Sequence, residues 1–297
     1  MQTYNIYKDT TRRIVNCIME GDIPWRRPFY TVDSKGKINY VSRIHYKGIN
    51  KLLLPEDGEY ITFKQAEKHK GTINKGSHGY MIIRTDRYIP EKNKAEAEKL
   101  KAEGKNFEHL YTFYLKKATV FKLSDTTGIP SKIIKGEMKT AENPTDMADF
   151  IIENFKLRYG FGIRNASENE CRFNTDNNTV YIPKKERFIT EEEYYNAVIC
   201  GMMRSVISQR EDDPPKKDEA KDELVIEIGA SMVLNGVGLR RKEATENTSA
   251  KVKEWVRALN NDYRLIFTAS RDAEKIAREI LQPLLGQDDE EDTDETS

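Results

Sequence analysis

The residues Cys200-Gly201-Met202-Met203-Arg204 lie in a segment with the apolar frame of a zinc-peptidase helix. In such helices a His-Glu-x-x-His pattern places two imidazole ligands and a general base on the metal side. Here Cys200 could offer a thiolate, but Gly201 has no carboxylate to take a proton from water, and Arg204 would bring a fixed positive charge toward the cation. No histidine follows His109 in the chain. We therefore predict no catalytic site, no bound metal and no other cofactor.

Periodicity and capping signals predict the elements around this segment. Thr190 with Glu193 three residues later forms a capping box that starts a helix over 194–208. Apolar residues at helical spacing predict a first helix over 6–20, ended by Gly21. Alternating segments predict three short strands before residue 190, at 161–164, 171–174 and 179–182. The predicted fold class is α+β: an N-terminal helix with a small antiparallel sheet, followed by a mostly helical domain with a short sheet.

The charge of the chain is unevenly distributed. Residues 1–130 hold 24 Lys and Arg against 15 Asp and Glu, and the rest of the chain holds 25 against 34. A basic half joined to an acidic half suggests a polyanionic partner for the first. We predict a basic domain over 1–130, a linker over 131–143, a second domain over 144–286 and a disordered acidic tail over 287–297. A charge-rich segment over 91–105 is expected to be a solvated helix or a tolerated insertion, and we assign it no function.

Several segments of the basic half place cations beside aromatic rings. Single-stranded nucleic acid favours this pairing, because cations follow the phosphates while exposed rings stack on unpaired bases. Each segment also has a simpler interpretation, since Trp25 could be a packed loop anchor and the lysines an ordinary solvated face. The expected contacts are the rings of Trp25, Phe29 and Tyr46, the cations Arg26, Arg27, Arg43, Lys47, Lys64 and Lys75, and the amides Asn50 and Gln65.

The order of these segments resembles a known family. Ile23-Pro24-Trp25-Arg26-Arg27-Pro28-Phe29, Tyr46-Lys47-Gly48-Ile49-Asn50, Thr62-Phe63-Lys64-Gln65-Ala66 and Thr119-Val120-Phe121 look like the N-terminal domain of ArdC-type antirestriction proteins. That domain also resembles part of conjugative plasmid primases. The resemblance implies sequence-tolerant binding of single-stranded DNA by a protein of a plasmid, phage or integrative element.

The second half resembles the zincin-like metallopeptidase domain of the same family. Val180-Tyr181-Ile182-Pro183 and Glu223-Leu224-Val225-Ile226-Glu227 fall in the expected order. In relatives with an intact site an acid of the second segment completes the metal ligands, so Glu223 and Glu227 are the matching positions. We expect Arg204 either to extend its charged end to solvent or to pair with one of these acids, and a pair would preserve the packing of the two helices without a metal. A residual site built from Cys171, Cys200 and a glutamate is the alternative, although zinc sites without histidine rarely mix Cys and carboxylate.

These observations favour a single-stranded DNA binding protein with an antirestriction role and a catalytically inactive peptidase-like domain. One alternative is an interaction module that binds a host or element-encoded partner through the second domain. Another is an active zinc metallopeptidase, which the substituted ligands disfavour. The sequence has no apolar run long enough to cross a bilayer and no signal-peptide core, which favours a cytoplasmic protein without a membrane partner.

Overall fold

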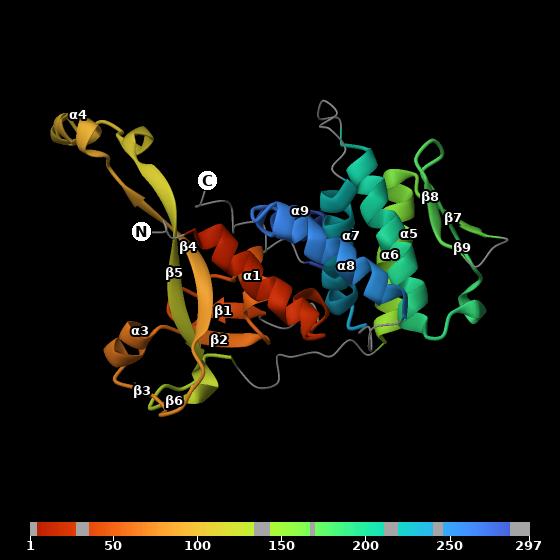
Figure 1. Cartoon of the computed structure of the whole chain (residues 1–297), viewed down its shortest axis with the longest axis horizontal. Helices are drawn as coiled ribbons and strands as arrows, with labels where there is room; N and C mark the ends of the chain where they lie inside the picture. Colours follow the sequence, from red (N-terminus) through yellow and green to blue (C-terminus); the bar gives the residue numbers. More distant parts are fainter. Residues whose placement is uncertain are drawn as a thin grey trace.

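The structure is a computed structural model that describes residues 5–27, 36–133, 143–166, 170–210, 219–239 and 246–285. It has the predicted α+β organisation, with a sheet-containing N-terminal region beside a helical C-terminal region (Figure 1). Within the described ranges no helix combines the length and apolarity needed to cross a bilayer. Most of the predicted linker and all of the predicted acidic tail lie outside the described residues.

The first helix, α1 (Ile6–Met19), forms where the apolar periodicity predicts it. The side chain of Asn5 caps its first turn by accepting from the backbone N–H of Lys8. Its buried residues recur every three to four positions, which gives the helix one apolar face. Beyond it, Gly21 takes a positive φ of 86°, a conformation that glycine adopts at low cost.

The main sheet has four strands in the order β1-β2-β5-β4. The β1–β2 pair is parallel, and the β2–β5 and β4–β5 pairs are antiparallel as expected. A smaller antiparallel pair joins β3 to β6. The strands are β1 (Lys37–Asn39), β2 (Gly58–Ile61), β3 (Thr72–Ile73), β4 (Tyr80–Tyr88), β5 (Thr112–Lys122) and β6 (Thr126–Thr127). The short helical turn η1 (Pro24–Arg26) precedes β1. Those between the strands are α2 (Ile49–Leu53), α3 (Phe63–Lys68), η2 (Glu108–Leu110) and η3 (Leu123–Asp125).

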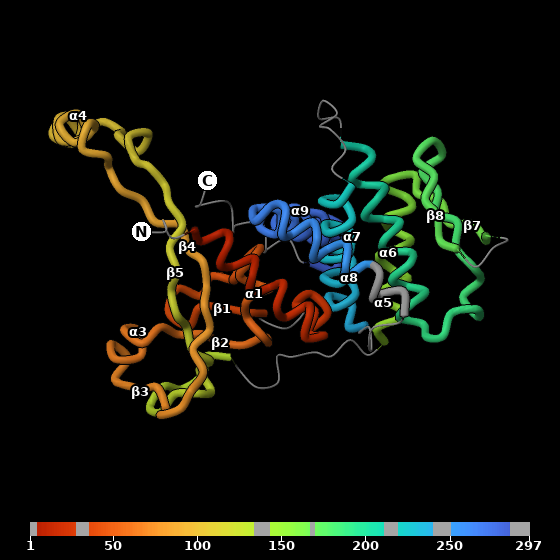
Figure 2. The backbone as a smooth tube through the Cα atoms, viewed as in Figure 1, coloured from red at the N-terminus to blue at the C-terminus, as the bar shows by residue number. Residues whose placement is uncertain are grey.

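Strands β4 and β5 are much longer than their neighbours, so their outer halves leave the sheet as a two-stranded ribbon. Figures 1 and 2 show this ribbon projecting from the body of the molecule, with α4 (Glu91–Ala102) at its far end. Helix α4 is the solvated helix expected in the charge-rich segment, and Ala97 is its buried residue. We call the outer ribbon, residues 84–88 and 112–117, the arm.

The C-terminal region packs five helices beside a small sheet in the order β7-β9-β8. Helix α6 begins at the predicted cap, where Thr190 accepts from the backbone N–H of Glu193. The helices are α5 (Pro144–Tyr159), α6 (Glu191–Ser208), α7 (Glu219–Gly236), α8 (Glu246–Asn261) and α9 (Leu265–Leu281). The remaining elements are β7 (Gly162–Asn165), β8 (Arg172–Asn174), β9 (Thr179–Ile182), η4 (Lys185–Arg187) and η5 (Gln282–Leu284).

One apolar core runs through both regions. Side chains of α1 and η1 belong to the same buried cluster as those of α6, α7 and α9. The Thr11 hydroxyl donates to the carbonyl of Tyr263 at 2.7 Å, which fixes α1 to the turn between α8 and α9. Figure 1 shows α1 lying between the sheet and the C-terminal helices. Helix α1 therefore acts as a packing layer shared by the two regions.

Candidate metal position and candidate nucleic-acid interface

Helix α6 lies unusually close to β9 at Gly201. A Cβ atom at this position would stand 2.9 Å from Cβ of Val180 and 3.2 Å from the ring of Phe161. Contacts this short force neighbouring atoms to move, which costs stability in a packed interior. The space that a general-base glutamate would need has therefore been closed by the packing of α6 on β9.

Arg204 forms the interhelical pair, which is one of the two arrangements that the sequence predicts. Its Nη2 donates to Oε1 of Glu223 in α7 at 2.6 Å. The two side chains are 39% and 40% exposed, so solvent weakens the attraction between them. The Arg204 guanidinium thus binds Glu223, one of the two acids that matched a metal ligand in sequence.

Glu227 also faces cations, although neither of them was predicted as its partner. Its side chain is 4% exposed and lies 3.5 Å from Nη2 of Arg26 and 3.2 Å from Nζ of Lys251. Arg26 comes from η1 in the N-terminal region and Lys251 from α8. A buried carboxylate needs such partners, because burial of an unpaired charge is costly.

The residues at this position do not fit a divalent cation. In the part of the chain that the structure describes, no three His, Cys, Asp or Glu side chains gather closely enough to hold a metal ion. Cys171 and Cys200 are free thiols, and desolvation raises the pKa of Cys171, which disfavours the thiolate that binds metals. The donor set of Cys171, Cys200 and a glutamate is therefore not brought together.

Trp25 does not lie where a stacking platform is needed. Its side chain is fully buried, and its ring packs edge-on against Trp255 of α8 with centroids 5.3 Å apart. Arg26 is 10% exposed and is turned toward Glu227. The stacking role expected of Trp25 is wrong, because a tertiary contact covers its faces; the packed-anchor alternative fits the structure.

Arg27 is engaged at the end of α1. Its Nε and Nη2 donate to the two carboxylate oxygens of Asp22 at 2.8 and 2.5 Å, and this contact lowers the pKa of Asp22. Its Nη1 also donates to the carbonyl of Leu52 in α2 at 3.4 Å. The phosphate contact predicted for Arg27 would require these bonds to change, and Phe29 lies outside the described residues.

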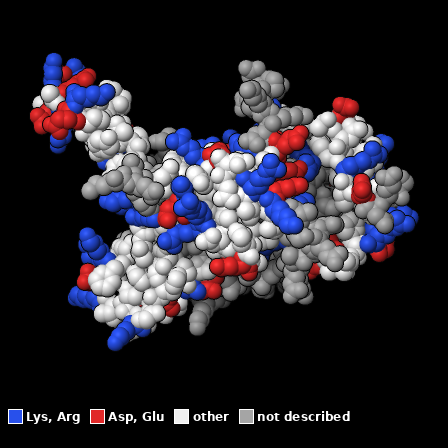
Figure 3. All heavy atoms as spheres, viewed as in Figure 1, with Lys and Arg blue, Asp and Glu red and all other residues white. Residues whose placement is uncertain are grey.

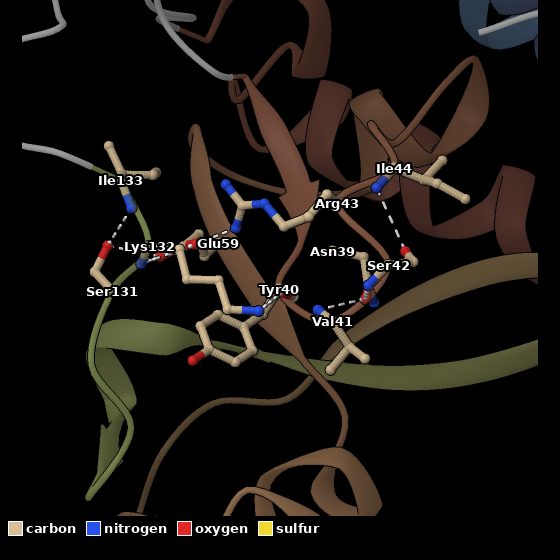
Figure 4. A network of polar contacts seen from close by, with 10 residues as sticks. All are labelled: Asn39, Tyr40, Val41, Ser42, Arg43, Ile44, Glu59, Ser131, Lys132 and Ile133. Atoms are coloured by element: carbon tan, nitrogen blue, oxygen red, sulfur yellow. Dashed lines mark hydrogen bonds and ion pairs between the residues drawn. The ribbon is translucent and has the colours of Figure 1, made fainter.

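Arg43 belongs to a network around the buried carboxylate of Glu59 (Figure 4). The Arg43 guanidinium bonds one oxygen of Glu59, while the hydroxyl of Ser131 and the backbone N–H of Lys132 donate to the same carboxylate. Lys132 in turn lies over the ring of Tyr40. The network ties the loop after β1 to the chain leaving β6, so Arg43 has a structural partner as well as partial exposure.

Tyr46 is buried, and the two predicted amides bond the backbone. The ring of Tyr46 is 8% exposed and meets Tyr60 edge-on, so the stacking role expected of it is also wrong. Asn50 donates to and accepts from the backbone of Ile83, both at 2.7 Å. Gln65 completes a capping box with Thr62 at the start of α3.

Three of the predicted cations have exposed side chains: Lys47, Lys64 and Lys75. Lys64 and exposed Lys68 lie in α3, exposed Lys70 lies between α3 and β3, and Lys75 lies in the turn between β3 and β4. The exposed aromatic side chain nearest to them in sequence is Phe63, at 54% exposure, in the first turn of α3. We call Phe63, Lys64, Lys68, Lys70 and Lys75 the α3 corner; its ring was part of a predicted motif but was not singled out.

Two protein families match the chain. Residues 4–121 match the N-terminal domain of the anti-restriction factor ArdC, and residues 150–272 match zincin-like metallopeptidases. The chain therefore carries an ArdC-type N-terminal domain followed by a zincin-like domain.

Two crystal structures of the antirestriction ArdC protein from the R388 plasmid share the fold. The metal-free structure has a TM-score of 0.68 and the Mn(II)-bound structure 0.66, each at 24% identity. They cover 94% and 96% of this chain, and 97% and 99% of theirs. At this identity the likeness establishes a common fold.

Curated relatives include two DNA primases called TraC from Escherichia coli, 25% and 24% identical over 93% and 91% of this chain. The chain spans only 27% and 19% of the length of those primases. An uncharacterized protein, y4eC of Sinorhizobium fredii (strain NBRC 101917 / NGR234), is 24% identical over 92% of this chain and 90% of its own length.

Proposed function

We propose that this protein binds single-stranded DNA through its ArdC-type N-terminal domain and acts in antirestriction for a mobile element or phage. In this proposal the zincin-like domain does not hydrolyse peptides and serves as a folded support. The membership of the N-terminal domain in the ArdC family supports the first part. The occupied and closed position around Gly201, Arg204 and Glu227 supports the second.

The α3 corner is the observation that carries the proposal. Phe63 exposes more than half of its surface, and the lysines around it are exposed as well. Figure 3 shows basic side chains around the edge of the molecule where α3 and β3 lie. An exposed ring among cations can stack on a base while the cations contact adjacent phosphates, without reading sequence.

A protein partner for the zincin-like domain is a second candidate. Phe150 and Leu157, two helical turns apart on α5, are 49% and 87% exposed. Exposed apolar side chains on one helix face are typical of surfaces that meet another protein. Capture of a host or element-encoded protein by the intact chain, lost on Phe150→Ser/Leu157→Ser substitution, would support this function.

Titration of labelled single-stranded and duplex oligonucleotides at several salt concentrations tests the main proposal. We expect a preference for the single strand and an affinity that falls steeply as salt rises, because bound cations release counterions from the phosphates. Phe63→Ala/Lys64→Gln should weaken binding, whereas Lys253→Gln/Lys275→Gln, two exposed lysines of α8 and α9, should leave it unchanged. Equal affinity for single strand and duplex would overturn the proposal.

A further inference from the structure

The arm leaves the sheet with rings and cations on its surface and little core beneath them. Its inner continuation is buried, since Ile82, Ile83 and Val120 pack in the interior. Beyond them Arg84 pairs with Lys116, Asp86 with Tyr114, and Tyr88 with Thr112 across the ribbon. Because side chains alternate along a strand, these six residues share one face.

That face carries an exposed aromatic pair at its outer end. Tyr88 is 51% exposed and Tyr114 is 41% exposed, and their rings meet edge-on with centroids 5.7 Å apart. A ring pair that served only to hold the ribbon together would bury most of its area. Here each ring keeps about half of its surface available for another flat group.

Two cations stand beside the rings on the same face. Arg84 and Lys116 are 53% and 52% exposed and share Asp86 at 3.2 and 3.6 Å. Ion pairs this exposed contribute little to stability, so either cation can turn to a phosphate at small cost. With two cations against one acid, the face favours an anionic ligand.

The opposite face of the arm also carries an exposed ring and a cation. Phe113 is 50% exposed, and Arg87 lies 4.3 Å from the ring centroid of Tyr111. Among the residues that the structure describes, five aromatic side chains rank as exposed, and three of them lie on the arm. The rings are therefore concentrated on a segment that the predicted contacts did not include.

We propose that the arm is a second contact surface for single-stranded DNA, on which Tyr88 and Tyr114 stack on bases while Arg84 and Lys116 contact phosphates. The inference rests on the proposed single-stranded DNA binding. The arm would be a second site for that ligand, in addition to the α3 corner. Its exposed rings would provide the base stacking that the sequence predicted for Trp25 and Tyr46, whose rings are buried. Figure 3 shows side chains of both charge signs on α4 at the end of the arm. We therefore limit the predicted DNA contact to the two strands of the arm.

The test compares two double variants of the full-length chain on a fluorescein-labelled oligodeoxythymidylate. Tyr88→Ala/Tyr114→Ala should weaken binding about thirtyfold or more, as expected for the loss of two stacked bases, and leave the salt dependence unchanged. Arg84→Gln/Lys116→Gln should make the slope of log affinity against log salt shallower by about 1.4, because each phosphate contact on a single strand contributes about 0.7. Tyr88→Phe/Tyr114→Phe keeps both rings and should bind like the unmodified chain.

Lys253→Gln/Lys275→Gln is the matched control for the cations, since it removes two exposed lysines from α8 and α9 and should bind like the unmodified chain. Melting temperatures of all variants show whether each remains folded. If the unmodified chain binds but both arm variants bind equally well, the arm inference is overturned and the proposed function stands. If the unmodified chain does not bind the oligonucleotide, the proposed function and the arm inference both fail.

Discussion

The guanidinium of Arg26 in η1 lies 3.5 Å from the buried carboxylate of Glu227 in α7, so a cation from the N-terminal domain reaches one of the two acids that the sequence comparison matched to a metal ligand. Lys251 approaches the same carboxylate from α8. Positive charge from two separate parts of the chain thus surrounds this carboxylate.

Removal of Glu227 should be far more damaging than removal of Glu223. Glu227→Ala removes the buried carboxylate that Arg26 and Lys251 both face, and loss of one member of a buried ion pair typically costs about 3–5 kcal/mol. Glu223→Ala breaks a pair that is 39% and 40% exposed and should cost at most about 1 kcal/mol. Urea unfolding of both variants measures the difference, and equal losses would contradict the assignment of Glu227 as the buried partner.

Added Zn²⁺ or Mn²⁺ should not stabilise the protein. A ligand that binds only the folded state raises the melting temperature as its concentration increases. Because the acids at this position already face Arg204, Arg26 and Lys251, we expect no such shift, and EDTA should also have no effect. Metal analysis of purified protein gives an independent measurement, and a stoichiometric content of either ion would reverse this conclusion.

Gly201→Ala should destabilise the protein although alanine is the better helix former. The gain in helix propensity is about 1 kcal/mol, whereas the new methyl group would stand 2.9 Å from Val180, and overpacking typically costs about 1–3 kcal/mol. Val180→Ala removes Cγ2, one of the two Val180 atoms that would lie 2.9 Å from the new methyl group, and so relieves part of the contact. The double variant should therefore lose less stability than the two single changes added together. Strict additivity in such a double-mutant cycle would argue against close packing of α6 on β9.

Trp25→Ala should reduce stability rather than DNA affinity. Truncation of a fully buried aromatic side chain costs about 3–5 kcal/mol, and the ring has no exposed face to offer a base. Urea unfolding is therefore expected to show a large loss for Trp25→Ala and a small one for Phe63→Ala. The order should reverse in the oligonucleotide titration, provided that each variant is assayed under conditions in which it remains folded.

The stability of the protein should rise with pH above neutrality through Lys37. Its Nζ is buried and donates to the carbonyls of Lys51 and Leu54 at 2.5 and 2.6 Å, and burial lowers its pKa to about 7. In the unfolded chain a lysine titrates near about 10.4, so between about pH 7 and 10 the unfolded state binds more protons than the folded state. Folding is therefore favoured as protons are removed, and this contribution is flat below about pH 7.

Lys37→Met gives the matching control. It should cost about 1–3 kcal/mol, because two carbonyls lose their donor, and it should remove the part of the pH dependence that belongs to Lys37. Urea unfolding at several pH values above and below neutrality measures both effects. An unchanged slope in the variant would assign the pH dependence to other groups.

Local patterns predicted the elements and the altered metal position. The spacing of Cys200 and Arg204, the cap at Thr190 and the periodicity of α1 are properties of neighbouring residues, and they recur in the structure. The pair between Arg204 and Glu223 follows from two adjacent helices. These features depend little on how distant segments pack.

The binding contacts were harder to predict because burial is decided by distant parts of the chain. Trp25 is covered by Trp255, and Arg26 is paired with Glu227, both from the other domain. The arm was missed, although alternation along 80–88 places Arg84 and Tyr88 on one face beyond the apolar Ile82. A run of alternating residues longer than its neighbouring strands was the signal that a ribbon would leave the sheet.

The backbone N–H of Gly48 donates to Glu274 of α9 at 2.5 Å, and Lys51 lies 2.7 Å from the same carboxylate, so the start of α2 is bound to the last long helix. Helix α1 is covered on its apolar side by the C-terminal helices as well. A polypeptide that ended after the first domain would therefore expose the apolar face of α1 to solvent and would be poorly suited to fold alone. A fusion of this domain to an unrelated domain would need a new apolar surface that packs against α1.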